Sequence, residues 1–98
     1  MKFPIAKFRV SGPSMSPTIN SGDFVVVNRW AYLFSKPKIG DIVVIRHPTK
    51  RITMVKRIKK IKLGAVFVVG DDKQLSTDSR NFGYVPTSKI IGKVIFRT

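Results

Sequence analysis

The chain has no cysteine and only five acidic residues among 98. Without cysteine it can form neither disulfides nor thiolate metal sites, and cysteine usage does not indicate a redox compartment. Nineteen Lys and Arg residues outnumber the acids and give a formal net charge of +14. Such a charge attracts anionic partners, but a biased composition gives the same excess, so nucleic-acid binding is not indicated. The acids lie in Gly-Asp and Asp-Ser-Arg steps, which are typical of turns and networks: Asp23, Asp41, Asp71, Asp72 and Asp78.

Long apolar runs are also missing. A membrane-spanning helix needs about 20 apolar residues, and no segment approaches that length. The first ten residues carry three basic side chains but no apolar core, so they do not resemble a cleavable signal. The sequence therefore predicts a soluble, cytoplasmic protein, with peripheral contact at an anionic membrane surface as the alternative. Its length and its 43% hydrophobic residues predict one small domain over residues 1–98.

Short apolar runs alternate with glycine and proline turns, and no segment shows a long helical period. This pattern predicts an all-β fold. We expect strands at Lys7–Val10, Phe24–Asn28, Asp41–Arg46, Ile52–Ile61, Ala65–Val69 and Ile90–Phe96.

One serine and one lysine lie in surroundings that suit catalysis. Ser14 lies in a loop bracketed by glycine and proline, residues 12–18 (Gly-Pro-Ser-Met-Ser-Pro-Thr). At the two-residue period of a strand, Lys56 shares a face with apolar residues: Ile52, Met54 and Ile58. Desolvation there would lower the pKa of Lys56, and a neutral amine can take a proton from a serine hydroxyl. In the alternative interpretation, Ser14 only forms a turn and Lys56 snorkels from a sheet edge.

These residues belong to an ordered series of motifs that resembles the serine endopeptidase family containing the type I signal peptidases. The family's Ser-Met-x-Pro-Thr motif matches residues 14–18. The other matching motifs are Gly22-Asp23, residues 40–44 (Gly-Asp-Ile-Val-Val), residues 56–58 (Lys-Arg-Ile), and Gly70-Asp71 with residues 76–83 (Ser-Thr-Asp-Ser-Arg-Asn-Phe-Gly). Five ordered motifs are much harder to obtain by chance than one. The resemblance implies a partly closed, coiled antiparallel sheet or barrel like the signal peptidase catalytic core, with no cofactor and no metal.

The resemblance also implies a role for each matching residue. Ser14 would be the nucleophile and Lys56 its general base, while Ser76 matches the serine that orients the lysine. The oxyanion hole would use the backbone N–H of Ser14, with Gly12 at the position that completes it. Gly12 offers no side-chain hydroxyl, so a second donor must come from the backbone. The residues at positions that support the site are Gly70, Asp71, Asp78 and Arg80.

Two features differ from most of that family. Only 13 residues separate Lys56 from Gly70, so a long insertion is missing and we expect a simple hairpin that turns at residues 62–64. The sequence also contains no apolar run long enough for the family's usual membrane anchor, so we expect an anchorless form. A short, anchorless form resembles the maturation proteases of nickel-type superoxide dismutase, which remove a leader from the dismutase precursor. We favour this function, with an N-terminal leader on a precursor protein as substrate, over a minimal type I signal peptidase that processes secretory precursors.

Two other functions remain open. A self-cleaving repressor uses the same Ser/Lys chemistry, but it needs an internal cleavage site and usually an upstream DNA-binding domain, and little chain precedes Ser14. A non-enzymatic basic β-barrel could bind nucleic acid. Its aromatic residues should alternate with basic residues on an exposed sheet face, whereas most aromatics here lie in loops or core-type runs.

Two further features carry weaker expectations. Residues 30–34 (Trp-Ala-Tyr-Leu-Phe) form a concentrated apolar patch outside the expected strands. The patch is either a lid over one end of the sheet or a surface that docks on a membrane or substrate. His47 precedes Pro48 at a strand end, and we interpret it as a solvated loop residue because Lys56 already fills the role of a base.

Overall fold

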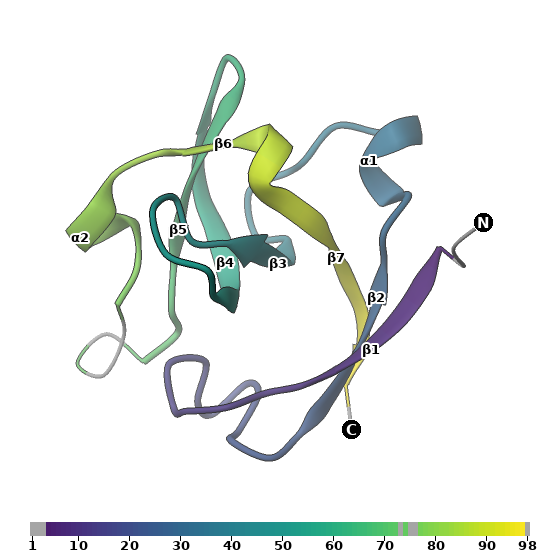
Figure 1. Cartoon of the computed structure of the whole chain (residues 1–98), viewed down its shortest axis with the longest axis vertical. Helices are drawn as coiled ribbons and strands as arrows, with labels where there is room; N and C mark the ends of the chain where they lie inside the picture. The colour runs from purple at the N-terminus through teal and green to yellow at the C-terminus, as the bar shows by residue number, and fades with distance from the viewer. Residues whose placement is uncertain (1–3, 73, 75–76, 98) are drawn as a thin grey trace.

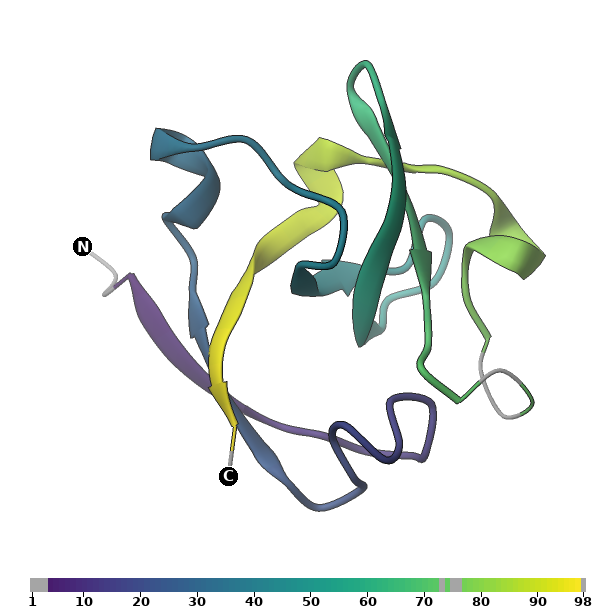
Figure 2. The same cartoon turned by 180° about the vertical axis from the view of Figure 1, so that it is seen from behind.

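A computed structural model describes residues 4–72, 74 and 77–97 of the chain. Seven strands form one sheet in the order β1-β2-β7-β3-β4-β5-β6, and neighbouring strands are antiparallel throughout. Figures 1 and 2 show that the sheet curls strongly round the interior. The all-β, coiled antiparallel sheet expected from the sequence is therefore confirmed.

The elements are short and closely spaced along the chain. The strands are β1 (Ile5–Arg9), β2 (Phe24–Asn28), β3 (Ile42–Arg46), β4 (Thr53–Lys62), β5 (Ala65–Val69), β6 (Val85–Pro86) and β7 (Ile90–Arg97). The helical segments are α1 (Ala31–Phe34), α2 (Ser79–Phe82) and the 3-10 helix η1 (Thr87–Lys89). Each of the six expected strands forms, with ends shifted by no more than two residues, whereas β6 and the helical segments were not expected.

Strand β3 lies in the middle of the sheet and is buried on both faces. Successive side chains of a strand point to opposite faces, so Val44 joins one core cluster while Val43 and Ile45 join another. The first cluster contains Val10, Met15, Ile19, Val25, Val27 and Val44. The second contains Val43, Ile45, Ile58, Val66, Val68 and Val85. This double burial explains why β3 reads as a continuous apolar run rather than an alternating one.

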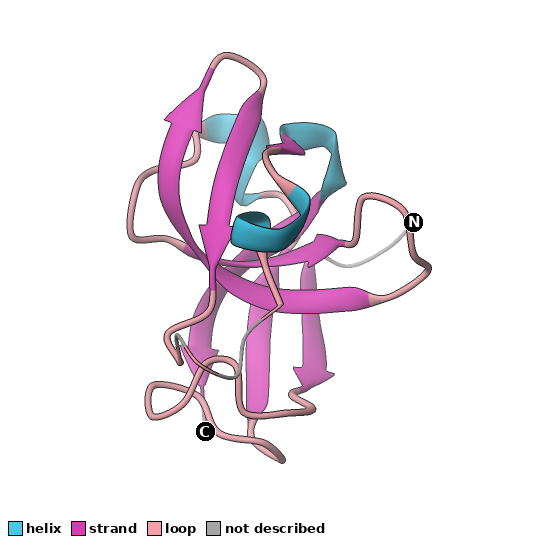
Figure 3. Ribbon diagram, turned by 90° about the vertical axis from the view of Figure 1, so that its left-hand side faces the viewer, coloured by secondary structure: helices cyan, strands magenta, loops and turns pink. Residues whose placement is uncertain are grey.

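Strands β4 and β5 form the simple hairpin expected from the short connection. Lys62 pairs with Ala65, so the turn consists of Leu63 and Gly64. Gly64 has a φ of 75°, a conformation that glycine adopts at little cost because it has no Cβ. Figure 3 shows the hairpin extending past the rest of the sheet.

Strand β7 crosses very close to β2 at Gly92. A Cβ atom built on Gly92 would lie 2.5 Å from Val27 Cγ1 and 2.7 Å from the carbonyl oxygen of Asn28. The two strands therefore need a residue without a side chain at this crossing.

The apolar patch at residues 30–34 forms α1 and does not close over the sheet. Tyr32 packs against the second core cluster, and its hydroxyl donates a hydrogen bond to Asp41 at 2.7 Å. Leu33 and Phe34 instead remain 71% and 84% exposed. The lid interpretation is therefore wrong for these two side chains.

Candidate active site

Ser14 lies in the loop between β1 and β2, and buried side chains anchor that loop. Met15 and Ile19 are buried in the first core cluster. The N–H of Ser16 donates to the carbonyl of Pro13 at 2.9 Å, and the N–H of Ile19 donates to that of Met15, also at 2.9 Å. These contacts fold the chain tightly round Ser14 and leave its side chain half-buried.

Lys56 lies in β4 and is only 2% exposed. It pairs with Val43 across the sheet. Burial lowers the pKa of Lys56 from its ordinary value, while the charge of Asp78 opposes that shift and the charge of Arg80 reinforces it. The predicted desolvation is therefore confirmed, and the interpretation of a snorkelling lysine is wrong. The same strand face becomes exposed toward its start, at Ile52.

Ser14 and Lys56 both line one cavity of ≈ 330 Å³ between β1 and β4. The other lining residues come from the end of β1 and from β3 and β4: Phe8, Arg9, Val10, Ser11, Val44, Ile52, Thr53, Met54 and Val55. The structure thus brings together the two residues that the sequence singled out, although 41 positions separate them in the chain (56 − 14 − 1).

A polar link ties the serine loop to the strand that carries the lysine. Asp71 accepts hydrogen bonds from Arg57 Nε and Nη2, both at 2.9 Å, and from the hydroxyl of Thr18 at 2.6 Å. Arg57 follows Lys56 directly, and Thr18 closes the serine motif. The hydrogen bonds from Arg57, reinforced by that from Thr18, lower the pKa of Asp71 against the effect of its burial.

A backbone contact adds to this link. The N–H of Asp72 donates to the carbonyl of Ser14 at 2.8 Å. Figures 1 and 2 both show the loop after β1 beside the segment that follows β5. The Gly-Asp-Asp turn therefore fixes where the serine loop lies relative to β4.

A second polar group surrounds Asp78, which is fully buried and whose charge acts on Lys56. Arg80 Nη2 pairs with Asp78 Oδ2 at 2.6 Å, and the N–H of Gly70 donates to the same oxygen at 2.8 Å. Asp78 also caps α2, where it forms a capping box with Asn81. The four supporting positions named by the resemblance thus form two connected groups, at Asp71 and at Asp78.

Ser76 lies outside the described residues. The backbone N–H of Gly12 donates to the hydroxyl of Ser21 at 3.1 Å. In this conformation the N–H of Gly12 is therefore engaged by Ser21 and is not available as an oxyanion donor. Gly12 could serve as an oxyanion donor only if it released that bond.

Sequence reasoning missed some residues of the site. Arg9 and Ser11 line the cavity at the end of β1, where only a short strand was expected. Arg57 and Thr18 lie inside motifs that the sequence did single out, but their link through Asp71 is a contact over 14 and 53 positions. Within the described ranges, His and acidic side chains form no group of three that could hold a metal ion.

The expectation that His47 is solvated is wrong. His47 is buried, and its ring meets that of Phe82 edge to face at 4.9 Å between centroids. Its Nδ1 accepts hydrogen bonds from the N–H groups of Thr49 and Lys50, both at 3.1 Å. This role could not be read from the sequence, because Phe82 reaches the ring from a distant part of the chain.

A curled antiparallel sheet with a loop serine and a buried lysine on one cavity is the architecture expected of a signal-peptidase-like hydrolase. The family model described as "Signal peptidase, peptidase S26" matches residues 1–59 and 59–98. The chain belongs to this family of serine peptidases.

Named relatives agree with that membership. The chain is 34% identical to the mitochondrial ATP-independent inner membrane protease subunit 1a of Arabidopsis thaliana, over 98% of this chain and 71% of the relative. It is 38% identical to the mitochondrial inner membrane protease subunit 1 of Schizosaccharomyces pombe, over 89% of this chain and 69% of the relative. It is 29% identical to the signal peptidase I of Bacillus caldolyticus, over 97% of this chain and 80% of the relative.

These relatives contradict the predicted soluble, cytoplasmic location. Two of them are named for the mitochondrial inner membrane and the third is a signal peptidase. Among the described residues, no helix has the length and apolar character needed to cross a bilayer. The prediction failed because it inferred a location from a missing apolar run, and such a run concerns only spanning helices.

Proposed function

We propose that this chain is a serine endopeptidase that removes an N-terminal leader from a precursor protein, with Ser14 as the nucleophile and Lys56 as the general base. The observation that carries this proposal is the burial of Lys56 on the cavity that Ser14 also lines. A solvated lysine stays protonated near pH 7 and cannot accept a proton, whereas a desolvated lysine can.

The chemistry follows from these two groups. The neutral amine of Lys56 takes the hydroxyl proton of Ser14 while the serine oxygen attacks the scissile carbonyl carbon. Lys56 then returns that proton to the leaving nitrogen as the C–N bond breaks, which leaves an acyl-enzyme on Ser14. Water attacks the acyl carbon and gives one proton to Lys56. The bond from that carbon to Ser14 Oγ then breaks, and Lys56 returns the proton to this oxygen, so the carboxyl product leaves and the serine hydroxyl is restored. The backbone N–H of Ser14 is the proposed oxyanion donor, and Gly12 is the second candidate.

Two strand edges that have no partner strand among the described residues offer a binding mode for the leader. Thr53–Lys56 of β4 pair with β3 on one side, and pairing with β5 begins only at Arg57. Strand β1 lies at the edge of the sheet. Both edges border the cavity with Ser14, so an extended peptide can add between them as a strand.

The identity of the precursor is a finer part of the proposal. The compact connection of 13 residues between Lys56 and Gly70 favours the maturation of a nickel-type superoxide dismutase. The relatives' names favour instead precursors that are processed at a membrane, as a minimal signal peptidase would do. Both substrates present a leader to the same cavity.

One experiment tests the activity and separates these substrates. The full chain is incubated with a dismutase precursor and with a secretory precursor, and the new amino termini are sequenced. Cleavage should be lost in Ser14→Ala and in Lys56→Ala and kept in two matched controls, Ser16→Ala from the same loop and Lys60→Ala from the same strand. Wild-type turnover by Ser14→Ala would show that another group is the nucleophile.

A further inference from the structure

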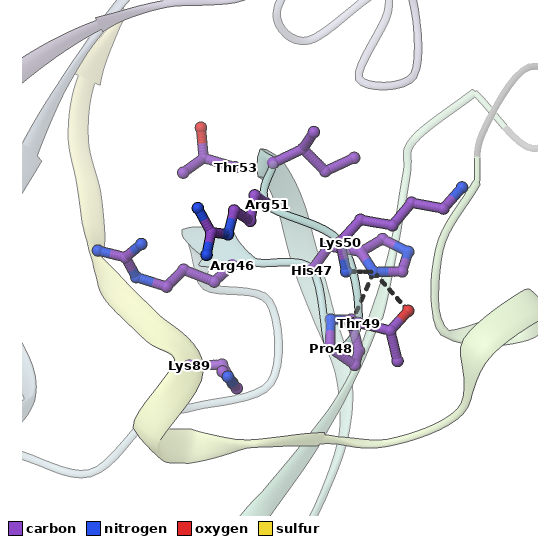
Figure 4. A pocket seen from close by; sticks show the side chains of 9 residues that line it. Arg46, His47, Pro48, Thr49, Lys50, Arg51, Thr53 and Lys89 are labelled. Atoms are coloured by element: carbon purple, nitrogen blue, oxygen red, sulfur yellow. Dashed lines mark hydrogen bonds between the residues drawn. The ribbon is translucent and has the colours of Figure 1, made fainter.

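A second cavity lies beside the site and is strongly basic. It has a volume of ≈ 500 Å³ and is bordered by the β3–β4 loop and by η1 (Figure 4). Of its nine lining residues, four are basic and none is acidic: Arg46, His47, Pro48, Thr49, Lys50, Arg51, Ile52, Thr53 and Lys89. Concentrated positive charge in a concave site favours an anionic ligand.

The basic side chains come from two different elements. Figure 4 shows Arg46 and Arg51 on one side of the β3–β4 loop and Lys50 extending to the other side. Arg46 and Arg51 are exposed, and Lys89 of η1 is half-buried. All five aspartates of the chain have hydrogen-bond partners elsewhere in the fold. Among the described residues, the ion pairs of the aspartates go to Arg57, Arg80 and Lys93 and not to Arg46 or Arg51, which leaves both guanidinium groups open to an acidic group of another molecule.

Buried His47 gives the loop a defined shape. Its Nδ1 accepts two backbone N–H groups of the loop, those of Thr49 and Lys50, and its ring is held against Phe82. The backbone of the loop that carries Arg46 and Arg51 is thus fixed from within, so only their side chains need ordering when a ligand binds.

This basic cavity continues the cavity that contains Ser14. Ile52 and Thr53 line both. Lys56 lies four to five positions beyond Ile52 and Arg51, roughly 13 to 17 Å along an extended strand. A peptide laid along β4 rises at the same rate, so it reaches the basic cavity about four to six residues from the scissile bond.

We propose that the basic cavity binds an acidic side chain of the substrate, about four to six residues from the scissile bond on one side of it. This inference rests on the proposed function, because it extends the same cleft. A side-chain carboxylate fits the site because guanidinium groups bind carboxylates through paired hydrogen bonds. The continuity with the Ser14 cavity favours a peptide over a membrane surface, since a membrane does not follow a cleft.

The test measures the binding of labelled leader-junction peptides to full-length Ser14→Ala protein by fluorescence anisotropy, and the cleavage of the same peptides by the wild type. The peptides are made in pairs that differ at one position, which is Glu in one peptide and Gln in the other. The varied position moves through about six residues on either side of the junction. We expect Glu to lower Kd about fivefold at one or two neighbouring positions on one side. Raising the salt to about 0.5 M should abolish most of that preference.

Charge-neutral variants, made in the Ser14→Ala background for binding and in the wild type for cleavage, assign the effect to the cavity. Arg46→Gln and Arg51→Gln should each reduce the preference for Glu to less than about twofold. Lys36→Gln makes the same charge change at an exposed residue outside both cavities and should keep the preference.

The outcomes separate this inference from the proposed function. Preference for Glu without cleavage by the wild type would support the basic cavity and overturn the peptidase. Cleavage with equal Kd for Glu and Gln at every position would overturn the basic cavity and leave the peptidase. If no peptide binds, the proposal for the basic cavity is also overturned. It is overturned as well if phosphatidylglycerol vesicles bind through Arg46 and Arg51 and the peptides show no preference for Glu.

Discussion

Replacing Asp71 with Asn tests whether the link between the serine loop and β4 holds the site together. The substitution keeps the shape of the side chain and one oxygen acceptor, but it removes the negative charge that Arg57 and Thr18 share. Arg57 would lose its charge-assisted pair of hydrogen bonds, and Thr18 would donate to a neutral amide. The expected result is a less stable protein whose serine loop is also less well placed.

The size of the effect follows from burial. The side chains of Arg57 and Asp71 are 34% and 17% exposed, so water screens part of the ion pair and its value lies well below that of a fully buried pair. Hydrogen bonds to charged groups contribute about 1.5–3 kcal/mol in favourable cases. After discounting for exposure, we expect Asp71→Asn to cost about 2 kcal/mol, which lowers the ratio of folded to unfolded protein roughly thirtyfold.

The loss should depend on pH in a defined direction. The pKa of Asp71 in the folded chain lies below its ordinary value of 3.8. A carboxyl group with a lowered pKa contributes stability that is complete above the unfolded value and is lost as pH falls through the folded value. The difference between wild type and Asp71→Asn should therefore be constant from pH 5 to pH 7, by about 2 kcal/mol, and should shrink below about pH 4.

Urea denaturation across this pH range, followed by tryptophan fluorescence and circular dichroism, measures the effect. We propose that residues 1–98 form one catalytic domain, so both signals should report a single transition. Asp23→Asn is the matched control, because Asp23 accepts a backbone N–H within a turn and its replacement should cost less. Combined with Thr18→Val, Asp71→Asn should cost less than the sum of the two single changes, since both act on one network. Equal losses at pH 3 and pH 7, or strict additivity with Thr18→Val, would refute this account of the link.

The remaining predictions concern Lys56 and the crossing of β2 and β7. Burial lowers the pKa of Lys56, and the base must be neutral, so kcat/KM should rise with pH at a midpoint below the ordinary pKa of lysine. A midpoint at the ordinary lysine pKa would contradict a desolvated base. Lys56→Arg should be inactive, because a guanidinium stays protonated, and turnover by this variant in the peptide assay would show that the position supplies only charge. Gly92→Ala should cost about 1–3 kcal/mol in urea denaturation, because its Cβ would meet Val27 and the Asn28 carbonyl; a neutral result would mean that the strands separate easily.

The sequence predicted the strands because each is set by local pattern. The run Ile42–Ile45 is apolar without interruption, as a strand buried on both faces requires, and Lys56 was correctly placed on a buried face. The helix α2 could not be predicted, because its four residues are too few for a helical period. Its capping box at Asp78 is a local contact, but the bond from the Val68 N–H to the Ser79 hydroxyl needs the folded chain.

Contacts between distant segments account for the other differences. His47 reads as a loop residue, but Phe82, which follows it by 35 positions (82 − 47), packs edge to face against its ring. The motifs around Ser14, Arg57 and Asp71 were each visible, but a sequence does not state that Thr18 and Arg57 meet on the same carboxylate. Residues were thus predictable where a repeating pattern or a motif fixed them, and not where two distant segments define the environment.

The scarcity of acids and the excess of basic charge have a common structural explanation. The aspartates act inside the fold: Asp23 and Asp41 accept backbone N–H groups in turns, and Asp71 and Asp78 hold the two polar groups round the candidate site. Five aspartates cannot balance nineteen basic side chains, so the basic side chains near the cleft keep a net positive field. Arg46 and Arg51 lie where that field adjoins the cavity of Ser14. A substrate with an acidic residue a few positions from its cleavage site would supply the charge that the chain itself lacks.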